Sequence, residues 1–178
     1  NFCNYHTEWM SVARDSVLPV VEQLFQANAV LFKDKINYKP PGGAGFWPHQ
    51  DCTAWCASDP DMPSKHITAM VAIDACTPEN GCLEVCDLDP GEELPNKNGV
   101  LTSLDGLRFQ NVELSPGDVV LFSSFLPHRA GNNTTDTSRR AVFLTYNAMN
   151  DGGDCHARYY TKRRPHKGIS LNHDFAGE

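Results

Sequence analysis

The sequence has no long hydrophobic run, and no apolar stretch approaches the roughly 18–20 residues that a membrane-spanning helix requires. A signal peptide is not recognisable at its start. Basic residues are too few to balance the acidic ones: 15 Lys and Arg stand against 22 Asp and Glu, and the net charge is −7. The basic residues clustered at 162–167 are expected to form a solvated face. These features argue against a membrane or a nucleic acid as the principal partner.

The seven cysteines lack the paired spacing of a zinc finger and the density of a secreted disulfide framework. Cys76, Cys82 and Cys86 fall close together, but no second Cys/His pair accompanies them at finger-like spacing. We therefore expect buried, reduced thiols in a cytoplasmic protein. Because the chain begins at Asn1 and not at a methionine, we also expect N-terminal residues to be missing.

The hydrophobic pattern predicts a single domain over residues 1–178, built mainly from short strands. Residues 7–27 repeat apolar side chains at helical spacing, and Pro19 must kink or restart that helix. Strands are expected at 29–39, 67–74, 82–86, 118–122 and 141–147, with loops at 87–98 and 123–133. A doubly wound sheet would need a helix between successive strands. The pattern favours a mainly β sandwich, jelly roll or barrel with a flanking N-terminal helix.

The strand expected at 29–39 alternates polar and apolar side chains. Because side chains alternate across a strand, we expect the polar face to carry Leu31, Lys33, Lys35, Asn37 and Lys39. Phe32, Ile36 and Tyr38 should fall mainly on the other face. Such a row of polar groups is either solvated or lines a polar pocket.

His49 and Asp51 are separated by one residue. In an extended strand, side chains at i and i+2 point to the same face, so this imidazole and this carboxylate would converge. They would supply two members of the two-His-one-carboxylate triad, which holds Fe(II) and leaves coordination positions open. A His-x-Asp pair by itself is more often structural or at the surface. His128, just beyond the 118–122 strand, is the candidate third ligand.

Arg139 stands eleven residues after His128, at the entry to the 141–147 strand. An arginine leading into a core strand is costly unless its charge is matched. Its planar guanidinium suits a carboxylate, which it can bind through two parallel hydrogen bonds. Strand alternation sends Arg139 and Arg140 to opposite faces, and the spacing favours Arg139 as the anion-binding residue.

The order of the motifs resembles the phytanoyl-CoA dioxygenase (PhyH) family over roughly residues 29–165. The motifs are HQD (49–51), NGCLEV (80–85), PGDVVLF (116–122), PHRAGNN (127–133) and RRAVFLTYN (139–147). The resemblance implies an Fe(II)- and 2-oxoglutarate-dependent dioxygenase on a double-stranded β-helix, a cupin-like jelly roll. It implies that His49, Asp51 and His128 bind Fe(II), and that Arg139 holds the distal carboxylate of 2-oxoglutarate. The implied reaction uses O₂ to hydroxylate a C–H bond and releases succinate and CO₂.

Two branches of the family are similar to different stretches of the chain. Residues 36–55 resemble ectoine hydroxylases, which implies that Lys39, with Asn37 beside it, binds the co-substrate and that Trp55 and Phe143 border the substrate. Residues 139–147 and 157–164 instead resemble bacterial 2-aminoethylphosphonate hydroxylases. Both branches act on small polar or zwitterionic molecules, so a substrate of that kind is expected. Lys39 as a solvated strand lysine, and Trp55 and Phe143 as plain core aromatics, are the alternatives.

The chain departs from the family pattern in two places. Relatives usually have a Pro-Gly-Ser-His turn after the NGCLEV strand, whereas here Cys86 runs directly into Asp87, so either this loop differs or residues are absent there. His66 and Ile67 also occupy the position where some relatives place a co-substrate-binding tryptophan. Three other functions stay open: a non-catalytic cupin-like module, a fatty acyl-CoA hydroxylase, and a zinc-dependent hydrolase that needs no O₂. The sequence makes no prediction of the oligomeric state.

Overall fold

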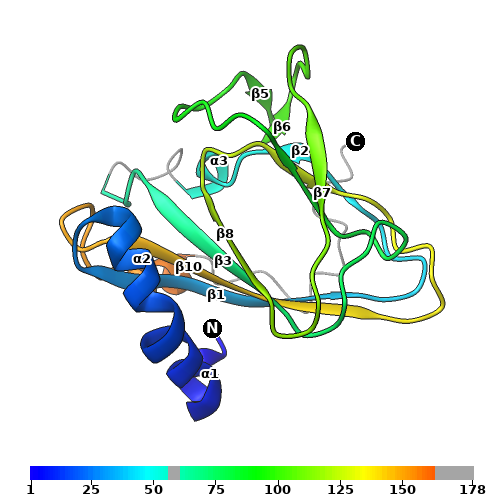
Figure 1. Ribbon diagram of the computed structural model, residues 1–178. Helices are drawn as coiled ribbons and strands as arrows, with labels where there is room; N and C mark the ends of the chain where they lie inside the picture. Colours follow the sequence, from blue (N-terminus) through cyan, green and yellow to red (C-terminus); the bar gives the residue numbers. More distant parts are fainter. Residues whose placement is uncertain (56–60, 163–178) are drawn as a thin grey trace.

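The computed structural model describes residues 1–55 and 61–162, and these form two antiparallel sheets with helices outside them (Figure 1). In chain order the elements are a 3-10 turn Cys3–Tyr5, α1 Thr7–Ser11, a π-helical turn Val12–Val17, α2 Leu18–Phe25, β1 Ala29–Lys39, β2 Phe46–His49, α3 Cys52–Trp55, β3 His66–Ala72, β4 Leu83–Cys86, β5 Asn96–Lys97, β6 Val100–Leu101, β7 Phe109–Val112, β8 Val119–Ser123, β9 His128–Ala130, β10 Arg139–Ala148 and α4 His156–Lys162. One sheet has the order β1-β10-β3-β8 and the other β5-β6-β2-β9-β4-β7. This confirms the mainly β, jelly-roll architecture. None of the helices described is long and apolar enough to span a membrane.

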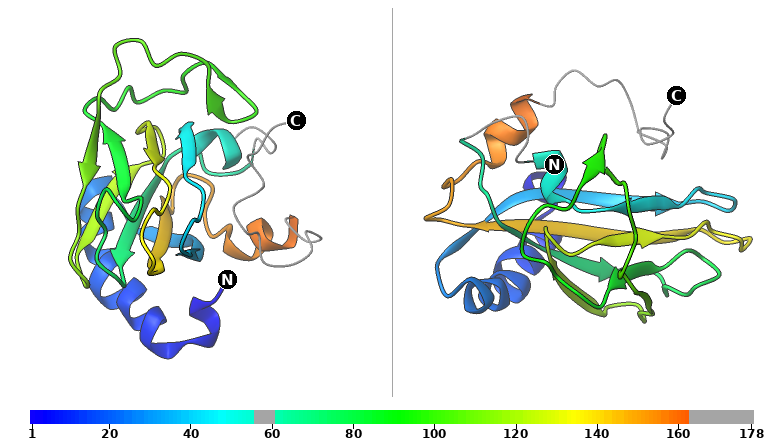
Figure 2. Two further views of the ribbon diagram at one scale, coloured as in Figure 1. Left: turned by 90° about the vertical axis from the view of Figure 1, so that its right-hand side faces the viewer. Right: turned by 90° about the horizontal axis from the view of Figure 1, so that it is seen from above.

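The N-terminal helices cover the outer face of the β1-β10-β3-β8 sheet (Figure 2). Apolar side chains such as Val17 and Val21 pack there against Val142 and Leu144 of β10. Pro19 lies in the first turn of α2, directly after the π-helical turn, and the backbone stays helical through this point. The helix ends at Gln26, whose left-handed backbone (φ 53°) turns the chain toward β1.

A β-bulge divides β1, so the side chains before it point to the opposite face from the one expected. Leu31 is opposite Tyr146, and Lys33 is opposite Thr145, the residue that precedes Tyr146 on β10. Phe32 is therefore an additional residue on β1. Leu31 therefore packs on the outer side with the helices, and its expected place on the same face as the lysines is wrong. Phe32 instead turns inward, where its ring lies 5.7 Å from that of Trp55. The residues from Lys33 onward keep the expected alternation.

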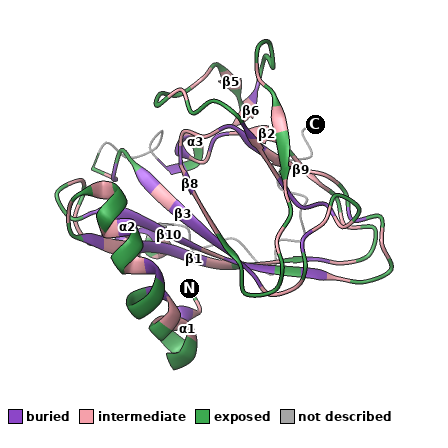
Figure 3. Ribbon diagram, viewed as in Figure 1, coloured by how far each residue is buried: buried purple, intermediate pink, exposed green. Residues whose placement is uncertain are grey.

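The space between the two sheets holds an apolar cluster that is flanked along β10 by buried polar residues on both sides. Met70, Ala141 and Phe122 of one sheet pack with Leu83 of the other. The buried polar residues include Lys39 and Arg139 as well as a hydrogen-bonded pair of threonines from β3 and β10. Figure 3 shows how the buried residues concentrate in the strands, whereas the helices are exposed on their outer side. The six cysteines in the described part of the chain are all buried and form no disulfide with one another.

Several short elements were not predicted from the sequence. The expected loop 123–133 contains β9, and the expected loop 87–98 contains β5, which pairs with β6 in a small hairpin. β6, β7, α3 and α4 were also not predicted. Each has only two to seven residues, so pairing with a neighbour defines it more than any pattern of its own. Residues 163–167 of the predicted basic cluster lie outside the described residues.

Candidate metal centre

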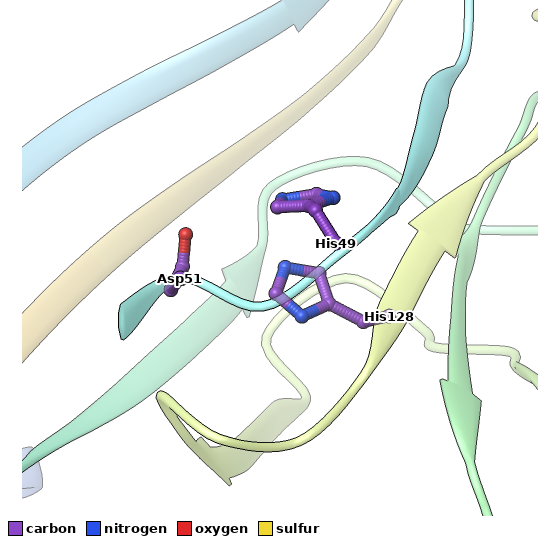
Figure 4. A group of neighbouring side chains, drawn as sticks. All are labelled: His49, Asp51 and His128. Atoms are coloured by element: carbon purple, nitrogen blue, oxygen red, sulfur yellow. The ribbon is translucent and has the colours of Figure 1, made fainter. Parts of the chain in front are cut away.

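Three predicted ligands meet where the ends of two paired strands approach one another (Figure 4). His49 is the last residue of β2 and His128 the first of β9, and the two are opposite one another in the antiparallel register. Asp51 follows in the turn that leads into α3. Each residue offers a ligand atom, and these atoms all lie within 4.8 Å of one another. The expectation of one continuous strand through Asp51 is wrong: the side chains converge because β2 ends and the chain turns.

Backbone carbonyls orient both imidazole rings. Nδ1 of His49 lies 2.7 Å from the carbonyl oxygen of Trp47, and Nδ1 of His128 lies 2.9 Å from that of Leu126. Nδ1–H donates in each pair, which leaves the lone pair of Nε2 for a metal ion. The ring centroids are 4.2 Å apart. The repeated contact with residue i−2 therefore fixes both rings before any metal binds.

The electrostatic environment keeps two of the ligands in their metal-binding forms. Burial, together with the nearby His128, lowers the pKa of His49 to about 4. Burial by itself would raise the pKa of Asp51, but His128 and Lys33 outweigh it and bring that pKa to about 2. At neutral pH His49 is therefore neutral and Asp51 ionised, the states that metal coordination requires.

Gln50 fixes the turn between the first two ligands, although no sequence signal singled it out. Its side chain is fully buried and donates hydrogen bonds to the carbonyl oxygens of Glu92 and Phe125. The amide of Leu94 donates to its Oε1 at 2.7 Å. One residue thus connects the His49–Asp51 turn to the loop after β4 and to the segment that precedes His128.

Arg139 and Lys39 form a buried cationic pair between the two sheets. They are opposite one another on β10 and β1, and only 4% and 2% of their surfaces are exposed. Both donate to the carbonyl oxygen of Gly81. Nε of Arg139 is buried without a hydrogen-bond partner among the described residues, so the guanidinium retains a donor for a ligand. Arg140 points outward as expected and pairs with Asp74 at 2.8 Å.

The loop after β9 is tied to the end of β1 by Asn133, which the sequence reasoning did not identify as a site residue. Its buried side-chain amide donates to the carbonyl oxygens of Lys39, Pro40 and Thr137 at 2.7–3.1 Å.

Asn37, the other expected co-substrate residue, is half-buried two positions before Lys39 on the same strand face.

Trp55 and Phe143, the two residues predicted to border the substrate, lie in different surroundings. Trp55 is 3% exposed and belongs to an apolar cluster with Phe32 and Tyr159. Phe143 is half-buried between the sheets, and Nζ of Lys35 lies 5.0 Å from the centre of its ring. The structure thus places Phe143 beside a charged side chain of β1 and Trp55 deeper in the packing.

The donor set fits a non-haem iron centre. Two imidazoles and one carboxylate bind one face of an octahedral Fe(II) ion and leave three positions open, and carbonyl-oriented rings are typical of metal-binding histidines. The group of His49, Asp51 and His128 has that composition. The buried Arg139 offers a charge for an anionic co-substrate.

The Phytanoyl-CoA dioxygenase (PhyH) family model matches residues 4–141. The chain is 40% identical over 157 residues to a 2-aminoethylphosphonate dioxygenase from the uncultured bacterium HF130_AEPn_1, covering 85% of this chain and 59% of that protein. It is 42% identical over 140 residues to a methylphosphonate hydroxylase of Gimesia maris (strain ATCC 29201 / DSM 8797 / 534-30), covering 76% and 52%.

The fold is similar to that of EctD from S. alaskensis solved with 2-oxoglutarate and 5-hydroxyectoine, with a TM-score of 0.69 at 24% identity over 90% of this chain and 60% of that one. The chain spans only about half to three-fifths of the length of these relatives. The motif order nevertheless predicted the family correctly, and the match extends across most of the chain. The chain belongs to the phytanoyl-CoA dioxygenase (PhyH) family.

Proposed function

We propose that this protein is an Fe(II)- and 2-oxoglutarate-dependent dioxygenase that hydroxylates a C–H bond of a small polar or zwitterionic metabolite, such as an aminophosphonate. The observation that carries the proposal is the convergence of His49, Asp51 and His128, whose ligand atoms lie within 4.8 Å of one another. Two relatives that are at least 40% identical are named as a dioxygenase and a hydroxylase of phosphonates, which supports this substrate class over an acyl thioester.

The side chains of this protein would divide the work of the reaction between them. His49, Asp51 and His128 would hold the iron, which when bound supplies the oxidation of the C–H bond by O₂ and 2-oxoglutarate, with release of succinate and CO₂. Arg139 would bind the distal carboxylate of 2-oxoglutarate through its guanidinium, with Lys39 adding a second positive charge. The apolar packing around Phe143 would exclude water from the reacting carbon.

A succinate-release assay tests this function. The full-length protein is reconstituted anaerobically with Fe(II), mixed with 2-oxoglutarate and a candidate substrate, and then exposed to air. The candidates are 2-aminoethylphosphonate, methylphosphonate, ectoine, betaines, amino acids and acyl-CoA esters. We expect O₂-dependent succinate with one of the small polar molecules, and none from an Asp51→Ala variant.

Each alternative gives a different result in the same assay. A cupin-like binding module forms no succinate with any candidate, even when fully loaded with iron. A zinc-dependent hydrolase forms its product in the sealed anaerobic vial. Succinate formed only with acyl-CoA esters would replace the small polar substrate by a thioester. The variant Asp105→Ala, which removes an exposed loop carboxylate, is the matched control for Asp51→Ala.

A further inference from the structure

Positive charge occurs at two separate places along the inward face of β1. Lys39 lies beside Arg139, whose charge acts on it. Lys33 lies six residues earlier on the same face, about 20 Å away at the usual rise of a strand. The charges of Lys33 and Lys35 both act on Asp51. Nζ of Lys33 also lies 4.5 Å from the ring centre of Trp55, in the short helix that begins directly after Asp51, so the candidate metal centre lies near Lys33 and Lys35.

Lys35 lies beside Phe143, one of the residues predicted to border the substrate, and its charge also reaches two of the proposed metal ligands. It is opposite Phe143 in the register of β1 and β10, and its ammonium lies 5.0 Å from the centre of that ring. Its charge acts on His49 as well as on Asp51. The side chain is only half-buried, so its ammonium can meet a ligand that enters the interior.

Lys33 holds a second ammonium in a nearly closed environment. The residue is 7% exposed, and its Nζ lies 4.5 Å from the ring centre of Trp55 and 5.8 Å from that of Tyr159. Burial of an ammonium group is costly, and these aromatic faces offset part of that cost. An anion bound near Lys33 would lower the cost further.

His66 provides an independent indication of a ligand at this end of the interior. It is 1% exposed, and both ring nitrogens are buried with no hydrogen-bond partner among the described residues. Its ring lies 4.5 Å from that of Phe32 and 4.8 Å from that of Trp55, and the charge of Lys33 acts on it. An imidazole always carries at least one N–H donor, and leaving a buried donor unsatisfied is unfavourable. An oxygen of a bound ligand would satisfy it.

We propose that Lys33, Lys35 and His66 form an oxyanion-binding subsite that holds the anionic group of the substrate and directs its neighbouring carbon to the metal centre. This inference rests on the proposed function and adds the substrate class: a molecule with a phosphonate or carboxylate close to the carbon that is hydroxylated. A phosphonate can carry two negative charges and three acceptor oxygens, so it matches two ammonium groups and one N–H better than a carboxylate does.

Calorimetric titration of the protein loaded with Mn(II) and 2-oxoglutarate, without O₂, tests the subsite separately from turnover. The ligands are 2-aminoethylphosphonate, its carboxylate analogue 3-aminopropionate, and ectoine. The variants are Lys35→Met, Lys33→Met, Lys33→Arg and His66→Phe, with the exposed Lys65→Met as the control for loss of one lysine charge. Each Met variant should bind the phosphonate about tenfold or more weakly, and His66→Phe several-fold more weakly. Affinity for 2-oxoglutarate should stay within about twofold, and Lys33→Arg should retain most phosphonate binding.

The outcomes separate this inference from the proposed function. Unchanged phosphonate affinity in the folded Lys35→Met protein would overturn the subsite, as would an equal loss of 2-oxoglutarate affinity. Failure of the wild type to bind any of the three ligands, each of which carries an anionic group, would also overturn it while leaving the dioxygenase activity intact. A protein that binds the phosphonate through these residues but never forms succinate would support the subsite and refute the function. If Lys33→Met fails to fold, Lys35→Met and Lys33→Arg still decide the outcome.

Discussion

Arg139 and Lys39 lie opposite one another on neighbouring strands, and both donate a hydrogen bond to the same oxygen, the carbonyl of Gly81, at 2.8 and 3.2 Å. Two buried cations that share one neutral acceptor repel each other. Burial first, and then the charge of Arg139, lower the pKa of Lys39 to about 8. A carboxylate bound beside both residues would reduce this repulsion. The pair is therefore suited to binding an anion and not to an internal ion pair.

The affinity for 2-oxoglutarate should fall as the pH rises through about 8. Lys39 loses its proton there in the free protein, whereas a bound anion favours its charged form, so binding takes up a proton near this pH. Titrations between pH 7 and 9.5 measure the slope. The Lys39→Met variant should bind more weakly and with little pH dependence in this range. An undiminished slope in that variant would assign the proton to another group.

Substitution of Gly81 should disturb the cationic pair from the backbone side. Gly81 has a φ of +68°, and a Cβ there would lie 2.2 Å from the carbonyl oxygen of Gly131 and 2.7 Å from Nζ of Lys39. Gly106 has a similar φ of +76°, but a Cβ there would have no other atom within 4 Å. Its alanine variant is therefore destabilised by the backbone strain alone. We expect Gly81→Ala to lose about 1–3 kcal/mol more in the free energy of unfolding than Gly106→Ala. Urea denaturation measures this difference.

The two alanine variants should also differ in co-substrate binding. Because Gly81 accepts hydrogen bonds from both cations, Gly81→Ala should weaken 2-oxoglutarate binding about tenfold. Gly106→Ala should leave it unchanged, since Gly106 lies in the exposed loop before β7. Equal affinities for 2-oxoglutarate in the two variants would mean that the Arg139–Lys39 pair does not bind the co-substrate.

Removal of the proposed carboxylate ligand should weaken metal binding more than any neighbouring change. Asp51→Ala leaves two imidazoles and opens a further position, so we expect iron affinity to fall by about 100-fold or more and hydroxylation to be lost. Manganese binding followed by electron paramagnetic resonance measures the first effect without turnover. Asp105→Ala should bind metal like the wild type. Retained turnover in Asp51→Ala would refute the assignment of His49, Asp51 and His128 as the metal ligands.

Trp55 and Phe143 should respond differently to truncation. Trp55 is almost fully buried with Phe32 and Tyr159, so Trp55→Ala should destabilise the fold by about 3–5 kcal/mol. Phe143 is half-buried beside Lys35, so Phe143→Leu should change stability by less than about 1.5 kcal/mol but raise the KM for the substrate. Thermal unfolding and initial rates measure the two effects. An unchanged KM in Phe143→Leu would make Phe143 a core residue alone.

The long strands were predictable because their own residues define them. β1 has the bounds expected from its alternation and from the Pro-Gly turn that follows, and β10 extends the expected strand by two residues at its start and one at its end. The bulge at Phe32 was not predictable, since it depends on how β1 pairs with β10. Likewise β9 has three residues, and only its pairing with β2 and β4 makes it a strand.

The candidate site was predicted in part for the wrong reason. Alternation along a strand suggested that His49 and Asp51 converge, whereas the structure brings them together by ending β2 and turning the chain. Gln50 stabilises that turn through loops that are distant in sequence, which no local pattern could indicate. His66 was noted only as a departure at a co-substrate position of some relatives, because a histidine next to a hydrophobic strand is usually a core residue. Its unsatisfied nitrogens became evident only from its surroundings.

A buried carboxylate joins both ends of the described chain to β1. Asp34 is 1% exposed and accepts hydrogen bonds from the backbone amides of Phe2 and Cys3 near the N-terminus. From α4 it contacts Nε2 of His156 at 3.1 Å and the hydroxyl of Tyr160 at 3.2 Å. Burial by itself would raise the pKa of Asp34, but His156 and the two amides together hold it well below the usual range.

The stability of the fold should therefore depend on pH through Asp34. A carboxylate whose pKa is depressed by folding contributes stability above its unfolded pKa of about 4, and this contribution is lost as the pH falls toward the folded pKa. At pH 7, Asp34→Asn should be less stable by about 2–4 kcal/mol because buried donors lose their charged acceptor. Urea denaturation at pH 7, 5, 4 and 3 should show the gap to wild type narrowing only below about pH 4. Asp105→Asn should show no gap at any pH, and a constant gap for Asp34→Asn would mean that shape, and not charge, holds the two ends to β1.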